Sequence, residues 1–182
     1  TPAISGTNVF MFSTDGALNC LTVNGAYLWS TNIGKGIPGW GLAGSPLLEG
    51  DLVIVNSGSR GTAVSRTTHS VVWGNNSGGN AGYSTPIAAT VGAQRQVIVY
   101  STVVYGLDPA SGSVLWSFPW GGGAAVPESI ADPIIVDGNK LFVSHGYNGG
   151  CAMLNLTGSG VTNSSGVLTN YLWTPNTRLS TR

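Results

Sequence analysis

The chain has 182 residues, and only 8% of them are charged, against about 25% in a typical soluble protein. Its seven basic and seven acidic residues cancel and form no basic stripe, which argues against recognition of nucleic acid through phosphates and against a polybasic membrane patch. No run of about 18 apolar residues is present, so we expect no membrane insertion.

Four copies of one pattern fill the sequence, at approximately residues 1–44, 45–84, 85–131 and 132–182. Each copy begins with a small or acidic residue before a proline, and these prolines, at positions 2, 46, 86 and 133, are 44, 40 and 47 residues apart. Each copy closes on an apolar pair followed by a tryptophan: Trp29, Trp73, Trp116 and Trp173. A fixed period of about 40–50 residues built from short strands is typical of a propeller or a solenoid.

Within each copy, two apolar stretches are separated by a turn. The first of these stretches are, in chain order, Val9–Phe12, Leu52–Val55, Gln96–Ser101 and Leu141–Val143. Glycine-containing hairpin turns precede three of them: Ser5–Thr7, Glu49–Asp51 and Asp137–Asn139.

The third copy gives the clearest prediction. It places strands at 96–101, 102–107 and 113–118, which are rich in β-branched and aromatic residues. Between the last two lies Asp108–Gly112, where proline presets one turn dihedral, aspartate bonds the backbone and glycine takes a positive φ.

Glycine-rich joints separate the copies at 34–44, 74–82 and 121–125, and residues 158–169 predict a longer loop in the fourth copy. No segment has a helical period over ten residues. We therefore expect one all-β segment over residues 1–182, a β-propeller of four-stranded antiparallel blades. The first copy shows no capping feature, which favours a piece cut from a longer repeat protein over a processed mature protein.

The stretch Gly106–Trp116 reads Gly-Leu-Asp-Pro-Ala-Ser-Gly-Ser-Val-Leu-Trp and closely resembles the repeat of the PQQ-binding-like (quinoprotein alcohol dehydrogenase-like) β-propeller family. That repeat is roughly small-Leu-Asp-x-x-Thr/Ser-Gly-x-x-x-Trp. The resemblance covers the whole chain but is partial in the other copies. The second copy has Ser65 and His69 where the third has Asp108 and Gly112, and the fourth has Asn155 at the aspartate position.

The resemblance implies that Trp29, Trp73, Trp116 and Trp173 dock each blade against its neighbour and are largely buried. It also implies a full ring of seven or eight blades, of which four repeats are about half. The family includes quinoprotein dehydrogenases and non-enzymatic members such as the outer-membrane assembly propeller lipoprotein. The enzymes carry an adjacent cysteine pair, calcium-binding glutamate and asparagine, and an aspartate base. No Cys-Cys pair is present here.

Few residues qualify as chemical sites. Asp15, Glu49, Asp51 and Asp137 lie beside turn glycines and are interpreted as turn residues, whereas Glu128 and Asp132 form the one acidic pair worth testing as ligands. Cys20 aligns with Ala63 and Gly106, which favours a small packed residue over a redox or metal role. Cys20 and Cys151 are the two cysteines of the sequence, which are too few for a disulfide framework, although their pairing in an oxidising compartment stays open.

Two further patterns are interpreted as chance or turns. Gly39–Gly44 matches G-x-G-x-x-G, but Ser45-Pro46 and a strand follow where the dinucleotide motif requires a helix. His69 occupies a turn position and His145 ends a strand, with no third ligand evident for zinc.

Trp40 and Trp120 fall in the joints, outside the repeat position. They form a possible binding face, with packing at the propeller centre as the alternative. The sequence therefore predicts a non-enzymatic binding or scaffold propeller, with no catalytic, cofactor or metal residues, located in the periplasm, on the cell surface or in the medium. Its expected partner is another protein or further blades. A fragment of a PQQ-dependent dehydrogenase and a structural subunit of a surface assembly are the alternatives.

Overall fold

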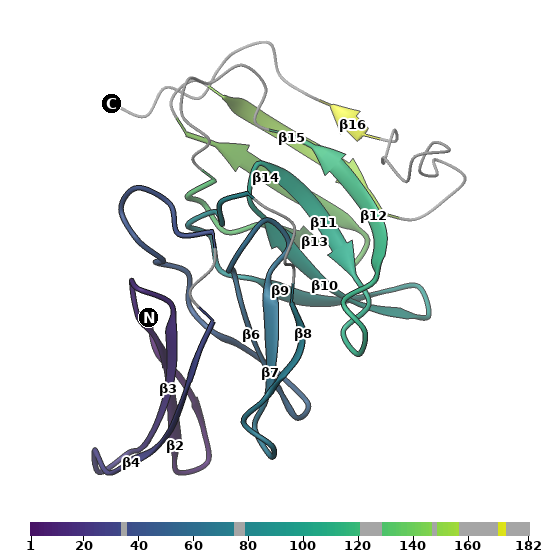
Figure 1. The fold of residues 1–182 in the computed structure, drawn as a ribbon. Coiled ribbons are helices and arrows are strands. Elements are labelled where there is room, and N and C mark those ends of the chain that lie inside the picture. Colours follow the sequence, from purple (N-terminus) through teal and green to yellow (C-terminus); the bar gives the residue numbers. More distant parts are fainter. Residues whose placement is uncertain (34–35, 75–78, 121–128, 147–148, 157–170, 174–182) are drawn as a thin grey trace.

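A computed structural model of the chain describes residues 1–33, 36–74, 79–120, 129–146, 149–156 and 171–173. Within these ranges every regular element is a β-strand, and sixteen strands form four sheets of four. Each sheet is an antiparallel meander whose strands pair in chain order. The predicted four-stranded antiparallel sheets are confirmed, and Figure 1 shows them following one another from the purple first sheet to the green fourth.

The strands have the following bounds. The first sheet comprises β1 (Ala3–Ser5), β2 (Asn8–Phe12), β3 (Ala17–Thr22) and β4 (Tyr27–Asn32). The second comprises β5 (Leu47–Glu49), β6 (Leu52–Val55), β7 (Thr62–Ser65) and β8 (Val71–Gly74). The third comprises β9 (Ile87–Val91), β10 (Gln94–Tyr100), β11 (Val103–Leu107) and β12 (Val114–Pro119). The fourth comprises β13 (Ile134–Val136), β14 (Lys140–His145), β15 (Gly150–Asn155) and β16 (Tyr171–Trp173).

The turns form where the sequence predicts them. Gly6, Gly50 and Asp137 have φ values of 57°, 56° and 52° in the hairpins that precede the second strands. His69 and Gly112 also match, because His69 N donates to Ser65 O at 2.9 Å and Gly112 N donates to Asp108 O at 2.8 Å. His69 is thus a non-glycine residue in the left-handed position, with φ of 59°, where most side chains are disfavoured.

The position aligned with Cys20 is a site of cross-strand packing. Cys20, Ala63, Gly106 and Met153 are paired with the four repeat tryptophans, and a register shift follows each of them. A bulge at this point aims the large indole across a small neighbour in the first three sheets. A methyl group on Gly106 would collide with the ring of Trp116.

Three apolar clusters join the sheets in pairs. The first links Phe10, Leu18 and Cys20 to Val53, Val55 and Val64 of the second sheet. The next links Ile54 and Ala63 to Val97, Val99 and Leu107 of the third. The last links Ile98, Tyr100 and Trp116 to Leu141, Val143 and Leu154 of the fourth. The second and third sheets therefore bury one face against the sheet before them and the other against the sheet after them, as stacked blades do.

The residues before the repeat prolines form a second link between sheets. Ser45 N donates to Thr85 Oγ1 at 3.2 Å, and Thr85 N donates to Asp132 Oδ1 at 2.5 Å. Each bond joins the start of one sheet to the start of the next, so this position does more than begin a strand.

Two predicted loops, 121–125 and 158–169, lie outside the described residues, as does Glu128. No helix in the described part of the chain is long and apolar enough to cross a membrane.

Candidate functional site

The described parts of the joints between sheets, and of the loops between second and third strands, lie at one end of the meanders, which we call the joint face. Backbone bonds hold these segments together: Leu42 N donates to Thr14 O at 3.0 Å, and Ala81 N donates to Gly36 O at 2.8 Å. The predicted chance match Gly39–Gly44 lies here without a helix after it. Gly41 has a φ of 80°, and a Cβ at this position would lie 2.8 Å from the Cβ of Thr14. The loop therefore requires glycine at this point.

A buried polar network fixes the middle of this face. The carbonyl oxygen of Tyr100 accepts bonds from Asn56 Nδ2 at 2.8 Å, Ser84 Oγ at 2.9 Å and Ser129 Oγ at 3.1 Å. All four residues are buried. Because hydrogen bonds are stronger in a low-dielectric interior, these three bonds hold the joints together, although Asn56 Oδ1 has no hydrogen-bond partner among the described residues. No local pattern in the sequence predicted this network, because its members lie far apart along the chain.

Next to this network lies an aromatic pair in which Trp40 is exposed and Tyr83 is half-buried. Trp40 is 69% exposed, its ring centroid lies 6.0 Å from that of Tyr83, and its backbone N–H donates to Tyr83 Oη at 3.4 Å. Gly41 N closes a turn onto Pro38 O at 2.9 Å just after the tryptophan. We call this pair the Trp40–Tyr83 platform.

Trp120 has different surroundings. It packs against the cluster between the third and fourth sheets, and its ring stacks on Phe118 with centroids 5.8 Å apart and planes 16° apart. Trp120 is half-buried and therefore less exposed than Trp40, and its part in a binding face stays a prediction.

Among the described residues, three polar side-chain atoms near this cluster are buried and have no hydrogen-bond partner: Tyr100 Oη, Trp120 Nε1 and His145 Nε2. The Tyr100 and His145 rings meet edge to face with centroids 6.5 Å apart. His145 Nδ1 lies 2.9 Å from Gly146 O, where a protonated Nδ1 would donate to that carbonyl. Burial raises the pKa of the Tyr100 phenol, which keeps that ring neutral.

The repeat tryptophans meet the following sheet in two cases. The ring of Trp29 stacks on His69, with centroids 4.7 Å apart and planes 18° apart. Trp73 Nε1 donates to Pro109 O at 2.8 Å, and its ring lies beneath Gly112. Both side chains are partly exposed rather than largely buried, because each covers a turn at the outer edge.

Trp116 behaves differently, since it is 7% exposed and its Nε1 donates to Gln96 Oε1 of its own sheet at 2.7 Å. The side chain of Trp173 lies outside the described residues. Docking by these four tryptophans stays a prediction.

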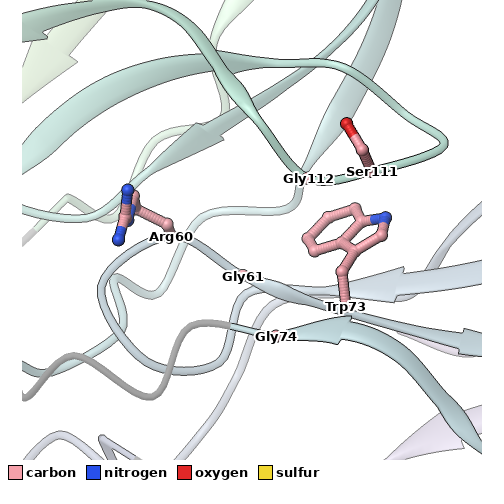
Figure 2. Close-up of a pocket in the computed structure, with 6 residues that line it drawn as sticks. All are labelled: Arg60, Gly61, Trp73, Gly74, Ser111 and Gly112. Carbon is pink, nitrogen blue, oxygen red and sulfur yellow. The ribbon is translucent and has the colours of Figure 1, made fainter.

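A partly open pocket of about 120 Å³ lies between the second and third sheets (Figure 2). It is lined by Arg60, Gly61, Trp73, Gly74, Ser111 and Gly112. The indole of Trp73 forms its floor below the Ser111–Gly112 turn, and Arg60 lies to its other side. Ser111 Oγ donates to Asp108 Oδ1 at 2.8 Å, and the Arg60 guanidinium carbon lies 6.0 Å from the centre of the Tyr105 ring. These polar groups are engaged within the protein, so the pocket is a weaker candidate than the platform.

Each acidic residue that the structure describes accepts a hydrogen bond from another residue of the chain. Asp51 accepts bonds from Ser65 Oγ at 2.6 Å and Thr67 Oγ1 at 2.7 Å, which lowers its pKa. Asp132 bonds the backbone of Thr85, as above. The prediction for Glu49 was incomplete, because this residue ends β5 and forms a bidentate pair with Arg95 of the next sheet, at 2.8 and 2.6 Å. The described residues hold no cluster of three His, Cys, Asp or Glu side chains.

Both cysteines are free and buried, and burial raises the pKa of each thiol. Cys20 belongs to the cluster between the first two sheets. A buried thiol with a raised pKa is a poor nucleophile, which agrees with packing.

With this geometry in place, comparison with known proteins identifies the family. Residues 1–174 match the family described as outer membrane protein assembly factor BamB. The chain belongs to this family. The resemblance to PQQ-like β-propeller repeats is confirmed, and no curated protein matches the chain.

Solved structures share the fold at low sequence identity. BamB from Moraxella catarrhalis is 16% identical with a TM-score of 0.59, over 96% of this chain and 47% of that one. A quinohemoprotein alcohol dehydrogenase from Pseudomonas putida is 12% identical with a TM-score of 0.68, over 98% and 34%. The PilY1 C-terminal domain from Pseudomonas aeruginosa is 13% identical with a TM-score of 0.59, over 85% and 40%. The chain thus spans less than half the length of these proteins.

Proposed function

We propose that this BamB-like chain is a non-enzymatic binding or scaffold module whose protein partner contacts the Trp40–Tyr83 platform. The observation that carries the proposal is the 69% exposure of Trp40 on a loop anchored from both sides. Tryptophan and tyrosine are the side chains most enriched at the energetic centres of protein interfaces, because they bury much area and lose little rotamer freedom.

The platform suits a protein partner for two further reasons. The buried network beneath it holds the backbone of the joints, so little ordering cost accompanies binding. Only 8% of the residues are charged, so we expect the contact to consist of apolar packing and hydrogen bonds and its affinity to fall little with added salt.

We place the module outside the cytoplasm, in the periplasm, on the cell surface or in the medium. The family match to an outer membrane assembly factor supports this location. A surface solvated by serine, threonine and asparagine is compatible with it.

Photo-crosslinking at position 40 tests the proposal. A photoreactive residue replaces Trp40 in the native host, and the control places it at Val72, an exposed apolar residue on β8. We expect a discrete protein adduct from position 40 and none from position 72. Binding of that protein to purified Trp40→Ala chain should be at least about tenfold weaker than to the Val72→Ala control, a loss of about 1.4 kcal/mol. Equal binding by the two variants would refute the platform.

A fragment of a quinoprotein dehydrogenase is the second candidate, favoured by the likeness of fold to such enzymes. Titration with PQQ and calcium, followed by dye-linked alcohol oxidation, separates the two. Stoichiometric quinone binding with turnover would establish the enzyme, whereas we expect neither.

A further inference from the structure

The ring pair of the Trp40–Tyr83 platform offers hydrogen-bond donors rather than acceptors. The indole of Trp40 carries one N–H donor and no acceptor. The Tyr83 hydroxyl accepts the backbone N–H of Trp40 at 3.4 Å, and it keeps its own proton as a donor. The two segments that carry these rings, residues 37–42 and 81–85, contain no Asp, Glu, Asn or Gln, so they supply no carboxylate or side-chain amide oxygen as an acceptor. A ligand with exposed acceptors and few donors therefore complements the platform.

The apolar surface extends beyond the two rings. Ile37, which precedes the turn that carries Trp40, is 41% exposed. Ile130 is 51% exposed, and it follows Ser129, whose carbonyl accepts the backbone N–H of Tyr83 at 2.9 Å. Trp40 lies between β4 and β5 and Tyr83 lies between β8 and β9, so each ring belongs to a joint with a described sheet on either side. An extended segment of a partner contacts more apolar area here than a compact group would.

We propose that the platform binds a proline-rich segment of its protein partner in the polyproline II conformation, an inference that rests on the proposed function. Proline has no backbone N–H, and a polyproline II helix makes no internal hydrogen bonds, so its carbonyl oxygens are free to accept from the indole N–H and the tyrosine hydroxyl. The centroids of the Trp40 and Tyr83 rings lie 6.0 Å apart with planes inclined at 40°, which presents two differently tilted apolar faces to the proline rings. Aromatic side chains are the recurring docking surface for such segments.

A proline-rich segment also suits the platform better than a sugar does. Because the polyproline II helix is preformed, binding orders little of the ligand. The segments 37–42 and 81–85 carry no charge, and a proline-rich segment requires none. Sugar hydroxyls donate as well as accept, and these two segments lack the carboxylate and amide oxygens that would accept from them.

Surface plasmon resonance with an immobilised, capped oligoproline peptide of about eight residues tests the inference. We expect the wild-type protein to bind this peptide and not a Gly-Ser peptide of equal length. Trp40→Ala should weaken binding at least about tenfold relative to Val72→Ala. Trp40→Phe, which keeps an aromatic ring and removes the N–H donor, should have an intermediate affinity. Because Trp40 is 69% exposed, its variants should fold as the wild type does, which circular dichroism checks.

The absence of binding to oligoproline, or equal binding by Trp40→Ala and Val72→Ala, would overturn the inference. Binding of the oligosaccharide cellohexaose in place of oligoproline would overturn it in favour of a sugar. The photo-crosslinking at position 40 separates this failure from failure of the proposed function. Mass spectrometry of the adduct should locate the crosslink in a proline-rich segment of the captured protein. A crosslink in a segment without proline would keep the platform as a protein contact and reject the proline-rich ligand.

Discussion

At the scale of residues, one turn position decides what two of the repeat tryptophans, Trp29 and Trp73, touch. His69 and Gly112 hold the same turn with nearly the same dihedral, φ of 59° and 69°. The imidazole of His69 stacks on Trp29, and the backbone of Gly112 lies over the ring of Trp73. The residue at this position therefore sets the distance between neighbouring sheets at their outer edge.

Replacement of Gly112 by alanine should be costly for two reasons. Its φ is left-handed, and the new Cβ would lie 2.6 Å from the Trp73 ring. Gly92 is a matched control, because it has φ of 61° and nothing within 4 Å. Urea denaturation should give a loss of about 1 kcal/mol for Gly92→Ala, from the dihedral alone. The loss for Gly112→Ala should exceed that by at least about 1 kcal/mol, from crowding. Equal losses would mean that Trp73 moves aside freely.

Some buried polar atoms near the joint face make hydrogen bonds within the chain, and others have no partner among the described residues. Removal of a bonded group should lower the free energy of unfolding, whereas removal of an unbonded group should not. Asn56→Leu leaves the Ser84 carbonyl without the amide that now lies at 3.0 Å, and should cost about 1–3 kcal/mol. Tyr100→Phe deletes a hydroxyl with no partner, and should leave the free energy of unfolding unchanged or raise it by up to about 1 kcal/mol. A large loss on Tyr100→Phe would reveal an ordered water on that hydroxyl.

At the scale of elements, the outer strands are unequal although their sequences look alike. Trp116 is 7% exposed and lies within the cluster between the third and fourth sheets, whereas Trp73 is partly exposed over a turn. Trp116→Ala should cost about 3–5 kcal/mol, as other large core truncations do. Trp73→Ala should cost less than Trp116→Ala. Thermal and urea unfolding of both variants checks the order, and a loss under about 1 kcal/mol for Trp116 would contradict its role in the core.

The turns also carry the acid sensitivity of the fold. Bonds from Ser65 and Thr67 lower the pKa of Asp51, and bonds from Ser111 lower that of Asp108, below the ordinary value of 3.8. A carboxyl whose folded pKa is depressed stabilises the fold above its unfolded pKa and loses that contribution as pH falls through its folded pKa. Stability should therefore decline as pH falls below about 3.8. Asp108→Asn should show a smaller decline in a pH series of urea melts. An unchanged decline in that variant would mean that other carboxyls dominate.

The sequence predicted the elements well and the contacts between them poorly, for a physical reason. Turn chemistry and β-branched runs act locally, so Asp108–Gly112 and the strands beside it follow from the residues alone. The pairing of Glu49 with Arg95 joins residues 46 apart, and no local pattern reports it. Trp40 and Trp120 both stand in glycine-rich joints, so the sequence could not separate the exposed platform from the packed ring.

At the scale of the whole molecule, little charge opposes association. The formal net charge is zero at pH 7. Solubility should therefore be lowest near neutral pH and rise on either side, because net charge keeps proteins apart. Turbidity of the concentrated chain across a pH series measures this. A flat profile would show that net charge does not control the solubility of the chain.

The bonds that precede the repeat prolines have a consequence for how such a chain can grow. The backbone N–H of Ser45 donates to one hydroxyl oxygen of Thr85, and that of Thr85 donates to one carboxylate oxygen of Asp132. A hydroxyl and a carboxylate can therefore both accept this bond, so the link places few demands on the sequence. Gene duplication can therefore add or delete a whole repeat without a new junction having to evolve, provided that an oxygen-bearing side chain stands before the proline.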